Sequence, residues 1–199
     1  MMTLVFFLEE PSAQEMLKGI LPKILPDHVV VQYIVFQGKQ DLEKQLVRKL
    51  KHWRTQDSQF LILRDQDSGD CRIIKSSLLE KCREANKSNA IVRVACHELE
   101  SFYLGDLQAV AKGLNISGLI KFQHKSKYRD PDRLSNPSTE LATLTKNCYQ
   151  KISGSRAISM HLDLEHNLSH SFNVLIKAIK YAVSSAEQRN GIRASLLKE

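Results

Sequence analysis

Four short runs of apolar, largely β-branched or aromatic residues recur through the first part of this 199-residue chain, and each is followed by a helical pattern. The runs occupy residues 4–8, 29–36, 60–63 and 90–96. Apolar runs of this length, bounded by charged or turn residues, are typical of strands buried on both faces. Strands that alternate with helices favour a parallel sheet covered by helices on both sides. The sequence therefore predicts an α/β fold with a mostly parallel four-stranded sheet.

The segments between these runs carry apolar side chains at helical spacing. Pro11 suits the first position of a helix, and Ser12 with Glu15 matches a capping box. Apolar stripes also run through residues 42–53 and 74–85. Such a stripe predicts a helix with one face buried, so these segments are the expected cover of the sheet.

The chain changes character after Lys112. Residues 113–137 are rich in glycine, proline and basic side chains, which favours a basic loop. Apolar spacing then predicts three helices, at residues 139–152, 155–164 and 169–185. The tail from Gln188 is polar and is expected to fray. We therefore divide the chain into a core over residues 1–112 and a basic loop with a helical extension, packed on the core, over residues 113–199.

Carboxylates follow three of the four apolar runs, at the points where the predicted strands end. They are Glu9, Glu10, Asp65, Asp67, Glu98 and Glu100. Parallel strands end at one edge of a sheet, and ligands of such sheets bind there. Strand alternation also points the side chains of Asp65 and Asp67 roughly the same way. Clustered carboxylates repel one another unless a cation lies between them, and oxygen ligands favour Mg²⁺ or Mn²⁺. One or two such ions would suit phosphodiester hydrolysis.

Basic residues supply the second chemical signal. The net charge of +7 favours polyanionic partners such as nucleic acid. Lys39 follows the second apolar run at the same predicted edge, where a lysine could neutralise charge that develops on a phosphate. The basic loop is either a nucleic-acid-binding segment or a solvated connection. Its candidate contacts are Lys121, Lys125, Lys127, Arg129 and Arg133.

The ordered set of motifs resembles a known family. Residues 8–12, Leu-Glu-Glu-Pro-Ser, resemble the V-E-G-x-[ST]-E motif of OLD-type nucleases, and residues 65–67, Asp-Gln-Asp, resemble the Asp-x-Asp of the same Toprim fold. Residues 36–42 and 98–106 are similar to a small Toprim-like group encoded beside AAA- or ABC-type ATPases, often in anti-phage systems. Glu9 matches the metal-site glutamate, whereas Glu10 stands where those proteins have glycine, so the choice of ligand between the two stays open.

The resemblance implies a Mg²⁺-dependent nuclease, the effector of an ATPase-associated defence complex. Its implied catalytic residues are Glu9, Asp65, Asp67 and Lys39. Nucleic acid and an ATPase are the implied partners, and a homo-oligomer stays open. A non-catalytic Toprim-like subunit is the first alternative. A receiver-type signalling domain is the second, although the chain shows no clear fifth strand followed by lysine.

Two features bear on location. No apolar run approaches the roughly 18 residues that a membrane-spanning helix needs. The four cysteines show no pairing pattern, which favours reduced thiols. We therefore expect a cytoplasmic protein without a membrane anchor.

Overall fold

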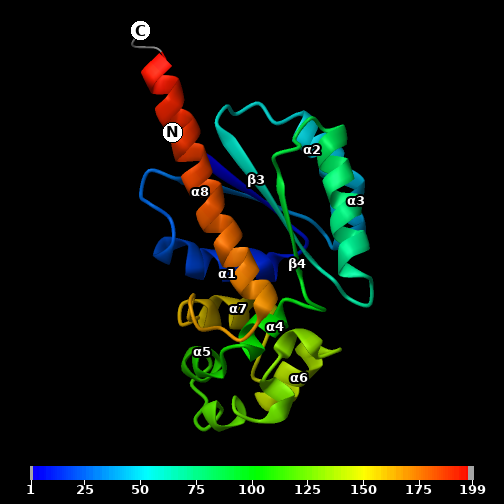
Figure 1. Ribbon diagram of the computed structural model, residues 1–199. Coiled ribbons are helices and arrows are strands. Elements are labelled where there is room, and N and C mark those ends of the chain that lie inside the picture. Colours follow the sequence, from blue (N-terminus) through cyan, green and yellow to red (C-terminus); the bar gives the residue numbers. More distant parts are fainter. Residues whose placement is uncertain (1, 197–199) are drawn as a thin grey trace.

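A parallel sheet forms the centre of the structure, a computed structural model that describes residues 2–196 (Figure 1). Its strands are β1 (Thr3–Leu8), β2 (Val30–Val35), β3 (Ser58–Asp65) and β4 (Ile91–Ala95). All are parallel, in the order β2-β1-β3-β4. The predicted α/β class and four-stranded sheet are confirmed. The chain runs outward from β1 to β2 and then crosses back to β3, so the topology switches direction between β1 and β3.

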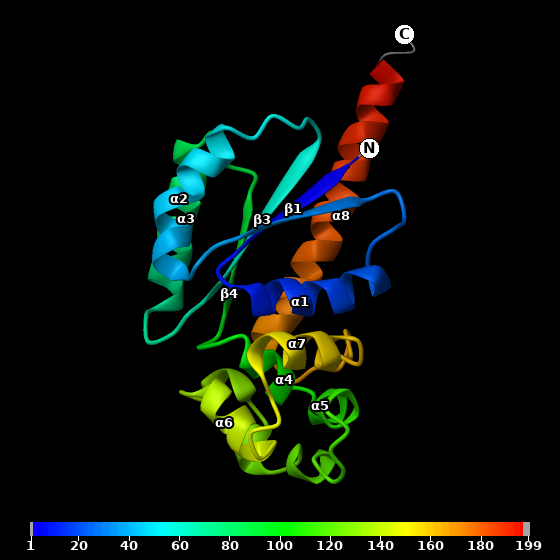
Figure 2. The same cartoon turned by 180° about the vertical axis from the view of Figure 1, so that it is seen from behind.

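Helices cover both faces of the sheet, as the sequence predicts. Side chains alternate along β1, so Val5 and Phe7 face one side while Leu4 and Phe6 face the other. The first side packs against α2 (Lys39–Lys51) and α3 (Cys71–Glu84). The second packs against α1 (Pro11–Ile20) and α8 (His170–Leu196), as Figures 1 and 2 show together.

A group of short helices lies at the carboxyl edge of the sheet, below the strands in both views (Figures 1 and 2). It comprises α4 (Glu100–Leu104), α5 (Leu107–Gly113), α6 (Pro137–Leu144), α7 (Lys151–Ser159) and the 3₁₀ turns Ile120–Phe122, Ser126–Tyr128 and Pro131–Arg133. A further 3₁₀ turn, Leu21–Lys23, extends α1. Leu141 and Tyr149 from this group share one apolar core with β1 and α8. The division of the chain at residue 112 stays a prediction.

Three predicted helices in the second half have different bounds. The one expected at residues 139–152 is interrupted, because Lys146 and Asn147 adopt left-handed backbone conformations with φ of 51° and 62°. The helix expected at 155–164 ends at Ser159. The helix expected at 169–185 is longer, since α8 continues to Leu196. Fraying of the tail stays a prediction, and residues 197–199 lie outside the described part.

The predicted capping box at the start of α1 is also wrong. The helix begins at Pro11, so Ser12 lies within its first turn and not at the N-cap. Its hydroxyl donates to the Glu10 carboxylate, whereas in a capping box it would accept from the backbone N–H of Glu15. Glu15 contacts Lys18, with 2.7 Å between Nζ and Oε1, and pairs with Arg156 of α7. Glu15 thereby links α1 to α7.

We expect Glu15→Gln to lower the free energy of unfolding at neutral pH. Hydrogen bonds from Arg156 and Lys18 hold the pKa of Glu15 below its ordinary value. Both cations are exposed, so screening limits the gain to about 0.5–1 kcal/mol. Because the folded-state pKa is depressed, this stability is present above the ordinary pKa of about 4.3 and is lost as pH falls through the folded value. Chemical denaturation at neutral and acidic pH measures the difference.

The exposed Glu165 is the matched control, and Glu165→Gln should leave the free energy of unfolding unchanged. A Glu15→Gln deficit of the same size in acid as at neutral pH would contradict the ion-pair explanation.

Within the described residues, no helix is both long and apolar enough to cross a membrane.

Candidate functional site

The site begins where β1 and β3 end side by side at the topological switch. Glu9 follows directly after β1, and its backbone N–H donates to the Leu63 carbonyl of β3 at 3.3 Å. Asp65 is the last residue of β3, and its N–H donates to Glu9 Oε2 at 3.1 Å. The side chain of Glu9 is 14% exposed. The two carboxylates are therefore brought together by main-chain pairing of the central strands.

Two further carboxylates and one lysine complete this group. Glu10 immediately precedes α1, and its Oε2 lies 3.2 Å from Nζ of Lys151 at the start of α7. Glu100 begins α4, is fully buried, and accepts a 3.0 Å hydrogen bond from the Tyr149 hydroxyl. Its second oxygen, Oε2, has no hydrogen-bond partner in the part of the chain that the structure describes. We call Glu9, Glu10, Asp65, Glu100 and Lys151 the strand-end cluster.

Burial and mutual repulsion dominate the electrostatics of the cluster. Burial raises the pKa of Asp65 well above its ordinary value, and the carboxylates of Glu10, Glu9 and Glu100 add to the shift. Burial also raises the pKa of Glu100, against the opposing charge of Lys151. For Glu9, burial raises the pKa and the N–H of Asp65 partly offsets it. Burial and the neighbouring carboxylates therefore disfavour the charged forms of these side chains, although Arg64 Nε lies 3.8 Å from Glu9 Oε2 and partly offsets this.

Lys151 is the functional candidate that the sequence does not reveal. Burial lowers its pKa, but the carboxylates of Glu100 and Glu10 raise it on balance. In the sequence it lies inside an apparently continuous helical pattern, whereas in the structure it is the first residue of α7. Only the break between α6 and α7 brings it to the strand ends, and no sequence pattern places it beside Glu10.

Asp67 and Lys39 flank the cluster. Asp67 lies beyond the end of β3 with φ of 54°, so strand alternation does not extend to it. Its N–H donates to the His97 carbonyl at 2.7 Å, which ties the loops after β3 and β4 together. Lys39 Nζ lies 2.8 Å from Asp67 Oδ2, and this hydrogen bond raises the pKa of Lys39. The negative charge of Asp67 also contributes to the raised pKa of Glu9, so the two carboxylates are neighbours.

The remaining predicted site residues have other contacts. Glu98 accepts a 2.7 Å hydrogen bond from the N–H of Ser138 and so satisfies a free donor at the start of α6. In the basic loop, Lys127 pairs with Glu140 and Arg133 with Asp130, at 2.6 Å and 2.9 Å. Lys121 and Lys125 lie over the ring of Phe122, at 5.4 Å and 4.4 Å from its centroid. A nucleic-acid-binding role for these residues stays a prediction.

The donor set of the cluster fits a hard cation in its chemistry. The carboxylates supply only oxygen ligands, and Glu100 Oε2 is buried without a partner. Among residues 2–196, however, no three His, Cys, Asp or Glu side chains are arranged to hold one metal ion. Lys39 and Lys151 contact oxygens of Asp67 and Glu10, so these two ion pairs bring positive charge to the edge of the cluster.

Comparison with known families places this geometry in context. A family model described as Domain of unknown function (DUF4276) matches residues 8–180. The chain belongs to this family. The matched DUF4276 segment begins at the end of β1 and reaches into α8, so it contains every candidate residue named above. No curated protein and no solved structure matches the chain.

Proposed function

We propose that this DUF4276 protein is a Mg²⁺- or Mn²⁺-dependent nuclease of the Toprim-like type, with its centre at the strand-end cluster. The observation that carries the proposal is the gathering of buried, mutually repelling carboxylates at the topological switch between β1 and β3. Sheets of this kind bind ligands at that point. A cation is the ligand that would relieve the repulsion.

Each residue then has a defined task. Glu9, Asp65 and Asp67 would hold the cation, and Glu10 and Glu100 lie behind them as further oxygen donors. When bound, the ion supplies Lewis-acid stabilisation of charge on the phosphodiester. Lys39 is 46% exposed, so its ammonium could turn from Asp67 to a phosphate oxygen and neutralise charge there. Lys151 keeps Glu10 oriented toward the cluster.

The first test is cleavage of plasmid, single-stranded DNA and tRNA by the purified protein, with Mg²⁺, with Mn²⁺ and with chelator. We expect cleavage only with metal. Glu9→Gln should lower the rate by about 100-fold or more, because loss of even an outer-shell partner of a metal site costs about 10- to 100-fold. Glu10→Gln should have a smaller effect, since Glu10 is already paired with Lys151.

Glu98→Gln is the matched control for this series. Glu98 contacts α6 instead of the cluster, and glutamine keeps an acceptor for the N–H of Ser138. Its activity should equal that of wild type. An active Glu9→Gln variant, or an inactive Glu98→Gln variant that still folds, would exclude the assignment of the site.

A second candidate function is a non-catalytic nucleic-acid- or ATPase-binding subunit. The observation that favours it is the lack, among the described residues, of three side chains arranged around one metal position. Metal-independent binding of nucleic acid without cleavage in the same assay would support it. The ATPase partner, the anti-phage role and the cytoplasmic location rest on the sequence and stay predictions.

A further inference from the structure

The two edges of the sheet differ in how their main-chain groups are covered. One edge is β4, where the Ala95 carbonyl accepts from the segment after β3 and alternation turns the Val92 carbonyl outward. The side chain of Arg93 donates to this Val92 carbonyl at 2.8 Å. The N–H of Cys96, just past the strand, donates to the Ser171 hydroxyl of α8 at 3.3 Å. A charged side chain and a helix therefore block this edge against further strands.

The opposite edge, the outer side of β2, has no such cover. The N–H of Val30 donates to the carbonyl that precedes β1 at 3.0 Å, and the N–H of Phe36 donates to the last carbonyl of β1 at 2.9 Å. Peptide groups alternate along a strand, so those of Val31, Tyr33 and Val35 point away from β1. Among residues 2–196, β1 is the only strand that pairs with β2. In Figure 2, β2 is the blue strand that lies in front of the others and leads into α2, and no helix of the described chain runs along its outer edge.

The composition of β2 also leaves this edge open to pairing. Its sequence, Val-Val-Gln-Tyr-Ile-Val, holds no charged residue, no proline and no glycine, and its register with β1 contains no bulge. Those are the devices that usually keep an edge strand from pairing with another chain. A mainly apolar groove borders the strand, where Val31 and Tyr33 lie beside Leu21, Pro22 and Leu25. The edge thus offers hydrogen-bonding groups and apolar surface together.

We propose that the outer edge of β2 binds β2 of a second copy of this chain, as an antiparallel pair with a two-fold axis at Tyr33. In this register Tyr33 lies opposite Tyr33 of the second copy, and Val31 lies opposite Val35. The outward N–H and C=O groups of these three residues then all find partners. A two-fold axis brings identical residues together, so a charged strand would repel its own copy, whereas β2 carries no charge.

The side chains around the pair fit this arrangement. Val31, Tyr33 and Val35 all pack on the α1 side of the sheet. The axis is perpendicular to the sheet, so these side chains from both copies meet on one face as cross-strand pairs beside the two grooves. The carboxyl edges of the two sheets point in opposite directions, so the proposed dimer does not depend on the nuclease activity. Contact through one strand is small for a protein interface, so the dimer should dissociate on dilution.

Sedimentation velocity across a wide range of concentrations tests the association, and we expect a monomer–dimer equilibrium for the wild-type chain. Val31→Pro removes an outward N–H and leaves the bonds to β1 intact, and edge strands tolerate proline at such positions. Two copies of the variant lose two hydrogen bonds, so the dissociation constant should rise by about tenfold or more. Thermal melting checks that the variant is folded.

Disulfide trapping tests the register and decides the matter if Val31→Pro does not fold. The background is Cys148→Ser, which removes the exposed native cysteine. Tyr33→Cys should form a disulfide-linked dimer under mild oxidation, because facing residues of a hydrogen-bonded antiparallel pair have Cα atoms about 5.5 Å apart, within reach of a disulfide. Val31→Cys alone is the matched control and should not cross-link, whereas a mixture of Val31→Cys and Val35→Cys proteins should.

Three results would overturn the proposal. They are a wild-type chain that is monomeric at every concentration, a folded Val31→Pro variant that dimerises like wild type, and cross-linking of Val31→Cys alone as strong as that of Tyr33→Cys. The first would leave the edge to a strand from a different protein. A failed nuclease assay leaves these results unaffected.

Discussion

Asp65→Asn is expected to abolish metal-dependent cleavage and at the same time to raise the melting temperature. Asp65 is surrounded by the carboxylates of Glu9, Glu10 and Glu100, and burial disfavours its charge. Asparagine keeps an acceptor for the N–H of Leu99 but removes the charge that a metal ion needs. Removal of this buried charge should therefore stabilise the fold by an amount typical of single substitutions, about 1–2 kcal/mol, or about 2–8 °C in Tm.

The stability gain should depend on pH in a defined direction. A carboxyl whose pKa is raised in the folded state binds its proton more tightly there than in the unfolded chain. Stability is therefore retained below the ordinary pKa of about 3.9 and falls as pH rises toward the folded value. The advantage of Asp65→Asn should be small near pH 4 and larger at neutral pH and above. Differential scanning calorimetry across this range, without metal, measures it.

Asp27→Asn is the matched control because Asp27 is exposed and lies away from the strand ends. It should change neither cleavage nor Tm. If Asp65→Asn melted below wild type at neutral pH, Asp65 would be a stabilising charge and the cluster would not be electrostatically strained. If the variant still cleaved, Asp65 would not belong to the catalytic centre.

Gly105→Ala should be among the most destabilising small substitutions in the chain. A Cβ atom at Gly105 would lie 2.0 Å from Asn167 Oδ1 and 2.7 Å from the backbone nitrogen of Ser169. Asn167 is buried and cannot move freely, since its Nδ2 donates to the Phe102 carbonyl and its Oδ1 accepts from Ser169. Overpacking of this kind costs about 3 kcal/mol, or about 6–12 °C in Tm.

Gly69→Ala provides the comparison. Its Cβ would meet the Cδ1 atom of Ile74 at 2.9 Å, but that atom is the end of a flexible side chain. Denaturant unfolding of both variants should show a clear loss for Gly105→Ala and a much smaller one for Gly69→Ala. Equal losses would mean that the turn after α4 can adjust and is less tightly packed than its contacts indicate.

The sheet could be predicted because its signal is local. Each strand is built around a short apolar run, although Gln32 interrupts β2 and Arg93 interrupts β4. The alternation of these runs with helical patterns predicts a parallel sheet. The same reasoning brings Glu9 and Asp65 to one edge. The contact of Glu98 with the N–H of Ser138 at the start of α6 could not be predicted in this way, because it joins segments 40 positions apart, and the metal-site role of Glu98 stays a prediction.

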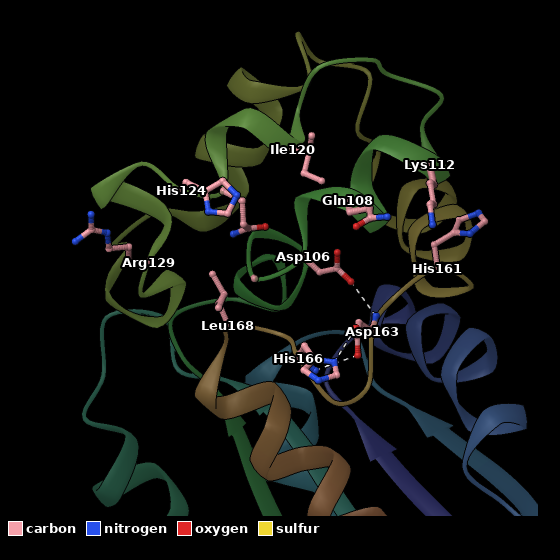
Figure 3. A pocket seen from close by; sticks show the side chains of 12 residues that line it. Asp106, Gln108, Lys112, Ile120, His124, Arg129, His161, Asp163, His166 and Leu168 are labelled. Atoms are coloured by element: carbon pink, nitrogen blue, oxygen red, sulfur yellow. Dashed lines mark hydrogen bonds and ion pairs between the residues drawn. The ribbon is translucent and has the colours of Figure 1, made fainter.

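The second half could not be predicted as well because its helices are set by tertiary contacts. Lys146 and Asn147 adopt left-handed conformations that interrupt an otherwise helical pattern, and this break is what directs Lys151 to Glu10. The cavity that follows α4 (Figure 3) is lined by residues from separate segments, among them Gly105, Gln123 and Leu168. The periodicity of apolar residues describes one segment at a time, so it does not predict contacts between residues that are distant in the sequence.

The contact between Lys151 and Glu10 has a consequence for how the protein acquires its function. These residues are 141 positions apart in the chain, and Tyr149, the partner of Glu100, comes from the same late segment. A nascent or truncated chain that ends before Tyr149 would have the carboxylates without their lysine and without the tyrosine hydroxyl. Strand pairing alone brings Glu9 and Asp65 together, but neutralisation of Glu10 and the hydrogen bond to Glu100 have to wait until this late segment has been made and has folded onto the sheet.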